Sequence, residues 1–159
     1  MKHRTPNIEH RTLNGSSRFA WVLNDSGCDG RKYDLEDRLL EFASTIIDLS
    51  EKLPASRAGN QVAGQILRSG TSPYPNHGEA ESAESREDFV HKLKVCLKEL
   101  RETRRWARLI HRKGWAKSES SLEMILTESD ELIRIFMSSI KTAKENALKT
   151  RRNPSDWTR

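Results

Sequence analysis

The chain has 159 residues, enough for one domain with a hydrophobic core. Hydrophobic residues make up 35% and charged residues 32%, a balance that favours helices with broad solvated faces over a sheet protein. The net charge is +5, but residues 33–144 carry 18 residues of each sign, so the excess lies in residues 1–32 and 145–159. Because no apolar run is long enough for a membrane span or a secretory signal, we expect a cytoplasmic protein without membrane contact.

The first 32 residues differ in pattern from the rest of the chain. They show no sustained hydrophobic period and contain one proline and three glycines. With six basic and three acidic residues, residues 1–32 are interpreted as a flexible basic arm. The apolar stretch Phe19–Leu23 within the arm is a candidate to dock on the folded domain.

A helical pattern begins at Asp34. Apolar residues recur at steps of three and four from Leu35 to Leu53, which predicts an amphipathic helix that Asp34 caps and Pro54 ends. A second helix is predicted from about Ser56. Its expected inward residues are Ala58, Val62, Ala63, Ile66 and Leu67. The small residues expected to let a neighbouring helix approach closely are Ala63, Gly64, Ser69 and Gly70.

Two prolines, Pro73 and Pro75, interrupt the second helix. Each removes a backbone donor and clashes with the preceding turn, which predicts a kink or a broken segment over residues 71–80. Asn76 is expected to cap the broken helix and to satisfy backbone groups that the prolines leave free.

The third helix has the clearest pattern in the chain. Ser85 and Asp88 resemble a capping box at its start, and Gly114 predicts its end. Its apolar stripe, at alternating steps of four and three, consists of Phe89, Leu93, Cys96, Leu100, Thr103, Ala107 and Ile110. A fourth helix is predicted with the inward residues Leu122, Ile125, Leu132, Ile133, Phe136, Ile140 and Ala143.

Four amphipathic helices joined by short connections predict an all-α fold, an antiparallel up-and-down four-helix bundle. The bundle is expected to occupy residues 33–144 and to be kinked near the end of its second helix. Residues 145–159 are interpreted as a basic C-terminal tail, so that both tails are flexible. No segment has the pattern of a strand.

The sequence offers little for catalysis or metal binding. Glu81, Glu84, Asp88 and His91 could share one helical face, but a di-metal bundle site needs Glu-x-x-His from two helices, and the fourth helix has no histidine. No arrangement of nucleophile and base and no glycine-rich phosphate loop is recognisable. We therefore expect no enzyme, no metal and no cofactor, and a buried free thiol at Cys96.

A row of cations lies on the third helix, about 150° around the axis from the apolar stripe. Its members recur at alternating steps of four and three and would line the outward face of the helix. This cation ridge consists of Lys94, Lys98, Arg101, Arg105, Arg108 and Arg112. It is the predicted nucleic-acid-binding site.

Two uses of the cation ridge stay open at this point. It could follow the phosphate backbone of RNA or DNA. It could instead be a solvated face partly neutralised by Glu99 and Glu102, or pair with the acidic first helix of a neighbouring copy. Trp106 and Trp115 could stack on bases or guanidinium groups, or they could lie at the edge of the core or at a subunit interface.

Residues 33–144 resemble a four-helix-bundle family that includes proteins encoded within intervening sequences of bacterial 23S rRNA genes. The residues that carry the resemblance lie in the second, third and fourth helices. They are Gln65–Ser69, Ser72, Asn76-x-x-Glu79, Glu84–Phe89, Leu97–Thr103 and Ile140–Ala143. Pro75 and the basic arm depart from the family pattern.

The resemblance implies a bundle that assembles into a homo-oligomeric ring, a pentamer, without an assigned enzymatic activity. A similar bundle serves retroelements as an accessory protein that binds nucleic acid and a reverse transcriptase. By this analogy we expect a module that binds RNA or DNA in a ribonucleoprotein or reverse-transcription context. The alternative is an assembly scaffold that binds proteins and no nucleic acid.

Overall fold

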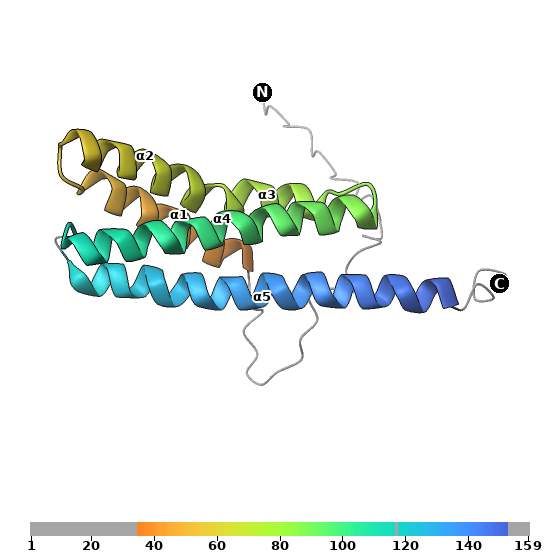
Figure 1. Ribbon diagram of the computed structural model, residues 1–159. Coiled ribbons are helices and arrows are strands. Elements are labelled where there is room, and N and C mark those ends of the chain that lie inside the picture. The colour runs from red at the N-terminus through yellow and green to blue at the C-terminus, as the bar shows by residue number, and fades with distance from the viewer. Residues whose placement is uncertain (1–34, 117, 153–159) are drawn as a thin grey trace, which may run out of the picture.

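The computed structural model describes residues 35–116 and 118–152, with side chains up to residue 146. All regular structure in this part of the chain is helical, as predicted (Figure 1). The helices are α1 (Leu35–Glu51), α2 (Arg57–Thr71), α3 (Pro73–Glu81), α4 (Arg86–Lys113) and α5 (Glu119–Arg152). None of these described helices is long and apolar enough to cross a membrane.

The five helices form four columns, because α3 continues the direction of α2 beyond a kink (Figure 1). Successive columns run in opposite directions. The most extensive contact joins α4 to α5, while α2 packs against both α1 and α4, and α1 closes the bundle against α5. The cation ridge therefore lies on a helix that is held from two sides, by the α2–α3 column and by α5.

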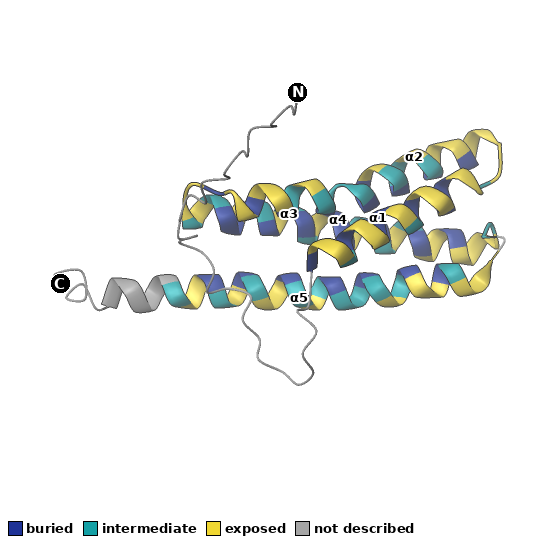
Figure 2. Ribbon diagram, turned by 180° about the vertical axis from the view of Figure 1, so that it is seen from behind, coloured by how far each residue is buried: buried dark blue, intermediate teal, exposed yellow. Residues whose placement is uncertain are grey.

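The core is built from the faces that meet between the columns (Figure 2). Every residue predicted for the apolar stripe of α4 is buried. On α5 the predicted inward residues are buried as well, except for Ile133, which is half-buried. Among the described residues Phe136 is the largest fully buried side chain, and its ring lies perpendicular to the His77 ring at a centroid distance of 6.2 Å.

Both ends of α4 follow the expected signals. Ser85 Oγ accepts a hydrogen bond from the Asp88 backbone amide at 3.1 Å, which confirms the predicted cap of α4. Gly114 ends α4 in the left-handed conformation with φ of 61°, where a residue with a side chain would be strained. At its C-terminal end, α5 continues to Arg152 and so enters residues 145–159, the segment predicted as the C-terminal tail.

The break in the second column spans fewer residues than the predicted range of 71–80. Helix α2 ends at Thr71, and α3 already begins at Pro73, so both prolines lie in a first helical turn where no backbone donor is needed. Asn76 Nδ2 donates hydrogen bonds to the carbonyl oxygen of Ser72 at 2.8 Å and to its hydroxyl at 3.0 Å. These bonds confirm the local capping role expected of Asn76.

The packing of α2 differs from the prediction at two positions. Val62 and Ile66 are buried as expected, but Ala58 is exposed at the start of the helix. Ser69 and Gly70 are buried against neighbouring helices, whereas a Cβ on Gly64 would meet nothing within 4 Å. The prediction was therefore wrong for Ala58 and Gly64, because the bundle contacts α2 on the side that carries Ser69 and Gly70.

Gly70 permits the close approach of α2 to α1. A Cβ at this position would lie 2.7 Å from Cγ2 and 2.8 Å from Cγ1 of Ile46, which is fully buried.

The basic arm of residues 1–32, with its apolar stretch Phe19–Leu23, lies outside the described residues.

We expect Gly70→Ala to lower the free energy of unfolding by about 1 to 2 kcal/mol, because overpacking against Ile46 outweighs the gain in helix propensity. Gly64→Ala is the matched control on the same helix. It adds a methyl group to open space and should raise the free energy of unfolding by up to about 1 kcal/mol. Urea denaturation of both variants measures the two changes, and shifts of equal sign would contradict the close approach at Gly70.

Candidate nucleic-acid interface

The six members of the cation ridge all lie at the surface of α4. They occupy the side of the helix opposite to its buried apolar stripe, so the predicted separation of the two faces is present. From Lys94 to Arg112, 18 steps along the helix, the ridge extends about 27 Å, at about 1.5 Å per residue. The described part of the chain thus presents one continuous line of positive charge along the outside of the bundle.

Most of the charge on this ridge is not neutralised by the described residues. Every member except Lys98 forms no ion pair with any described residue. Lys98 Nζ lies 3.7 Å from Glu99 Oε1 but keeps three quarters of its side chain exposed. Arg101 Nη2 lies 3.5 Å from the sulfur of Met137.

The two carboxylates nearest to the ridge are bound by a residue of α2. Arg68 Nη2 lies 2.5 Å from Glu102 Oε1, and Nη1 lies 3.4 Å from Oε2 of the buried Glu99. The sequence had suggested that Glu99 and Glu102 neutralise the ridge. Because Arg68 engages both of them, the ridge keeps more of its charge than a count along α4 indicates.

Other cations of the bundle are committed to the contacts between helices. Arg104 Nε of α4 lies 2.6 Å from Asp130 Oδ1 of α5. Arg38 of α1 donates to both oxygens of Glu128 at 2.7 Å and to Glu131 at 2.8 Å. Such bidentate contacts link α1 to α5, and they distinguish these structural cations from the members of the ridge.

A second charged surface lies between α1 and α5. A groove of about 800 Å³ is lined by carboxylates and apolar side chains, together with Arg38. Its acidic members are Asp37, Glu41, Glu123 and Glu128, and its apolar members are Phe42, Met124 and Ile125. Of these, Met124 is 60% exposed. The groove has the opposite sign of charge to the cation ridge.

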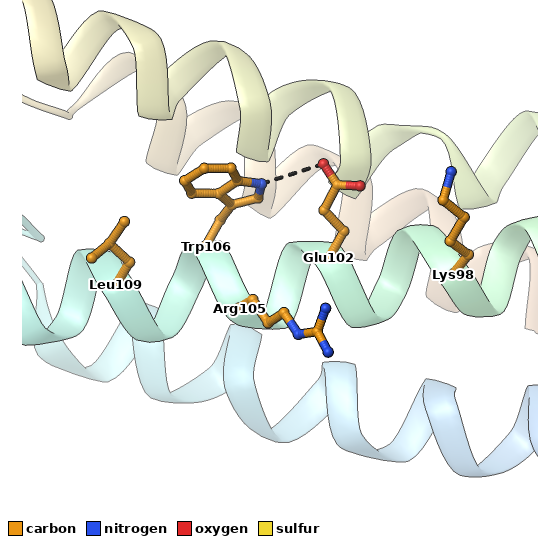
Figure 3. Close-up of a pocket in the computed structure, with 5 residues that line it drawn as sticks. All are labelled: Lys98, Glu102, Arg105, Trp106 and Leu109. Atoms are coloured by element: carbon orange, nitrogen blue, oxygen red, sulfur yellow. Dashed lines mark hydrogen bonds between the residues drawn. The ribbon is translucent and has the colours of Figure 1, made fainter.

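A smaller hollow of about 500 Å³ lies beside the ridge (Figure 3). It is lined by Lys98, Glu102, Arg105, Trp106 and Leu109. Trp106 is half-buried against the core and directs its Nε1 at Glu102 Oε1, 3.4 Å away. The half-buried Trp115 lies apart from this hollow, and the ammonium group of Lys113 stands 5.8 Å from the centre of its ring.

The acidic residues considered for a metal site do not share one helix. Glu81 ends α3, Glu84 lies in the connection, and Asp88 and His91 belong to α4. The continuous helical spacing that would align them is therefore absent. Within the described residues, no three His, Cys, Asp or Glu side chains come together in an arrangement that could hold a metal ion.

Cys96 is the buried free thiol that the sequence predicted. Its sulfur lies 3.6 Å from the carbonyl oxygen of Pro73, across the contact between α3 and α4. Burial raises the pKa of the Cys96 thiol to about 12. At neutral pH the thiol stays protonated, and a protonated, buried thiol is a poor nucleophile.

Sequence reasoning placed the cation ridge on the outward face of α4 and Trp106 beside it, but it did not identify the contacts of Arg68 or the groove between α1 and α5. Arg68 acts on carboxylates 31 and 34 residues further along the chain, and no local spacing signals such a pair. The groove depends on which faces of α1 and α5 meet, and the local sequence pattern does not determine those faces either.

The chain is similar to known proteins over most of the bundle. The model of the 23S rRNA-intervening sequence protein family matches residues 31–138, a range that contains the whole cation ridge. A solved structure, a protein of unknown function from the S23 ribosomal protein family of Bacteroides thetaiotaomicron, is 40% identical with a TM-score of 0.62. The match covers 67% of this chain and 97% of that protein. No curated protein matches the chain.

Arg68→Ala should lower the free energy of unfolding by about 1 kcal/mol, because the buried carboxylate of Glu99 loses a partner while the exposed guanidinium limits the effect. Arg134→Ala is a control with the same change of charge, since Arg134 is exposed and forms no ion pair with a described residue. Arg134→Ala should change the free energy of unfolding by less than about 0.5 kcal/mol. Urea denaturation of the two variants tests the difference, and equal losses would show that Arg68 does not stabilise the bundle through its carboxylates.

Cys96 should resist thiol reagents while the protein is folded, because burial and its raised pKa keep the thiolate scarce. The chain has a second cysteine, Cys28, so the test uses a Cys28→Ser background. In this background we expect no appreciable reaction with Ellman's reagent at pH 8. Reaction of one thiol per chain should follow in guanidinium chloride. Rapid reaction of the folded protein would contradict the burial of Cys96.

Proposed function

The chain belongs to the 23S rRNA-intervening sequence protein family, and from this premise we propose that it is a non-catalytic, homo-oligomeric module that binds RNA or DNA through the cation ridge. The observation that carries the proposal is the unneutralised charge of α4. Five of the six cations in the ridge lack an ion pair with any described residue, while Arg68 holds the carboxylates of Glu99 and Glu102. A surface of this kind is suited to phosphates.

The mode of binding follows from the kind of groups in the ridge. Lysine and arginine contacts to phosphates fix position on the nucleic acid and carry little sequence information. We therefore propose weakly sequence-specific binding that falls steeply with salt. The basic residues beyond residue 144, among them Lys149, Arg151 and Arg152, would add to the electrostatic attraction.

The non-catalytic part of the proposal is supported by what the reactive side chains do. Cys96 is buried and protonated, and Asn76 is used to cap a helix. Glu81 and Glu84 lie outside α4, which carries Asp88 and His91, so the four side chains do not share one helix. Cys96 and Asn76 thus each have a structural role that needs no substrate.

Assembly into a ring is the second part of the proposal. Large apolar side chains stay exposed on α1 and α5, and burying them against a second copy would be favourable. They include Leu40, Ile47 and Met124. The family resemblance suggests a pentamer, placed in the cytoplasm within a ribonucleoprotein or reverse-transcription context.

The alternative function is an assembly scaffold without a nucleic-acid role. Its supporting observation is the acidic groove between α1 and α5, which is complementary in charge to the cation ridge. In this version the ridge of one copy enters the groove of the next, a head-to-tail contact that closes into a ring when the rotation fits. In the first function phosphates neutralise Arg105 and its neighbours, and in the second the carboxylates of a neighbouring copy do so.

Charge reversal separates the two functions. The variant R101E/R105E/R108E should lose at least a hundredfold in affinity for RNA or DNA at low salt, because it removes several phosphate contacts. The control R134E/K141E/K144E makes the same total change of charge at exposed positions of α5, and it should keep most of the affinity. Fluorescence anisotropy across a salt series measures both variants and the slope of log affinity against log salt.

Light scattering of the same variants gives the second readout. An intact oligomer with lost affinity supports the nucleic-acid function. Dissociation of the oligomer supports the scaffold. Unchanged affinity in R101E/R105E/R108E would remove the cation ridge from the proposal.

A further inference from the structure

The hollow beside the cation ridge combines an aromatic ring, an exposed apolar side chain and two cations. Trp106 and Leu109 stand three residues apart and lie on the same flank of α4. Leu109 is 41% exposed, although it adjoins the half-buried indole. An exposed apolar patch within a basic face is not explained by phosphate contacts alone.

The side chains of the hollow point to different sides of the ridge (Figure 3). Trp106, Glu102 and Lys98 extend toward α2, while Arg105 extends to the other side of α4. A strand that follows the ridge would pass between the Arg105 guanidinium and the indole. Its phosphates would meet the cations, and its bases could turn toward Trp106.

The one carboxylate that lines this hollow does not oppose such binding. Glu102 is held by Arg68 at 2.5 Å and accepts a hydrogen bond from the indole of Trp106 at 3.4 Å. Its negative charge is therefore compensated from α2. The hydrogen bond also fixes the orientation of the indole, which reduces the conformational entropy lost when a ligand stacks on it.

We propose that this hollow receives an unpaired base, which stacks on Trp106 and contacts Leu109 while neighbouring phosphates lie on Lys98 and Arg105. The inference rests on the proposed nucleic-acid function and deepens it, because it assigns single-stranded RNA or DNA as the ligand. In a duplex the faces of the bases are already stacked on one another. Only an unpaired base can present its face to the ring, and such stacking tolerates any base.

Binding of a single strand and of its duplex tests the assignment. The probes are a labelled 15-nucleotide RNA, the DNA of the same sequence and the corresponding duplexes, titrated with the full chain at several salt concentrations. The wild-type protein should bind the single strands more tightly. Trp106→Ala should weaken single-strand binding by about tenfold or more and leave duplex binding within about twofold.

Two further variants separate stacking from folding. Trp106→Phe keeps an aromatic ring and should retain most of the single-strand preference. Trp115→Ala is the matched control, because Trp115 is also half-buried but lies outside the hollow, and its affinities should match wild type. Thermal melting of each variant identifies any loss of fold.

A fluorescence measurement keeps the test independent of Trp106→Ala. The triple variant W21F/W115F/W157F leaves Trp106 as the only tryptophan of the chain. A base stacked on the indole should quench its emission when single strands are added, with less quenching by duplex. Absence of quenching at saturating single strand would overturn the assignment.

The outcomes also separate this inference from the function on which it rests. Equal binding of single strands and duplexes, or full single-strand affinity in a folded Trp106→Ala, overturns the stacking site and leaves the ridge in place. No binding of any nucleic acid at low salt overturns both. Single-strand preference that is lost in Trp106→Ala and kept in Trp106→Phe supports the site.

Discussion

The arrangement of the bundle depends on how closely α2 approaches its neighbours at Ser69 and Gly70. Gly70 leaves no room for a side chain against Ile46 of α1, and the Ser69 hydroxyl accepts a hydrogen bond from Thr103 Oγ1 of α4 at 3.0 Å. Both contacts lie in the core, where an unpaired hydroxyl would be costly. With α2 held at this distance, Arg68 reaches the carboxylates of α4. The packing of small residues and the electrostatics of the surface are thus consequences of one close approach.

The bundle divides its basic residues into two groups with different roles. Arg38, Arg68 and Arg104 link helices through carboxylates and so contribute to the fold. The members of the cation ridge lie on the outer face of α4, where the described residues supply few partners. A net charge of +5 does not reveal this division. What matters for the proposed binding is the number of cations on one face that lack an ion pair with the described residues.

The sequence predicted the parts of the structure that depend on local pattern. The stripe of α4, the cap at Ser85 and the end at Gly114 are periodicities or turn signals within one element, and the structure confirms them. The incorrect or missing predictions concern contacts between different helices. Gly64 and Gly70 are the same residue on the same helix, and only the position of α1 decides which of them is buried. The contact of Arg68 with Glu99 joins residues 31 apart, so the charge balance at the ridge could not be derived from spacing.

The connection between α4 and α5 bears on how the chain reaches this structure. The most extensive helix pair in the bundle is formed by two consecutive helices, joined by a short turn that begins with the left-handed residue Gly114. Closing so short a loop costs little entropy. Helical bundles fold within microseconds to milliseconds, since many of their contacts are local. A helical hairpin of α4 and α5 can therefore serve as the folding nucleus onto which α1 and the kinked second column dock, so the face that carries the cation ridge would be among the first parts of the molecule to form.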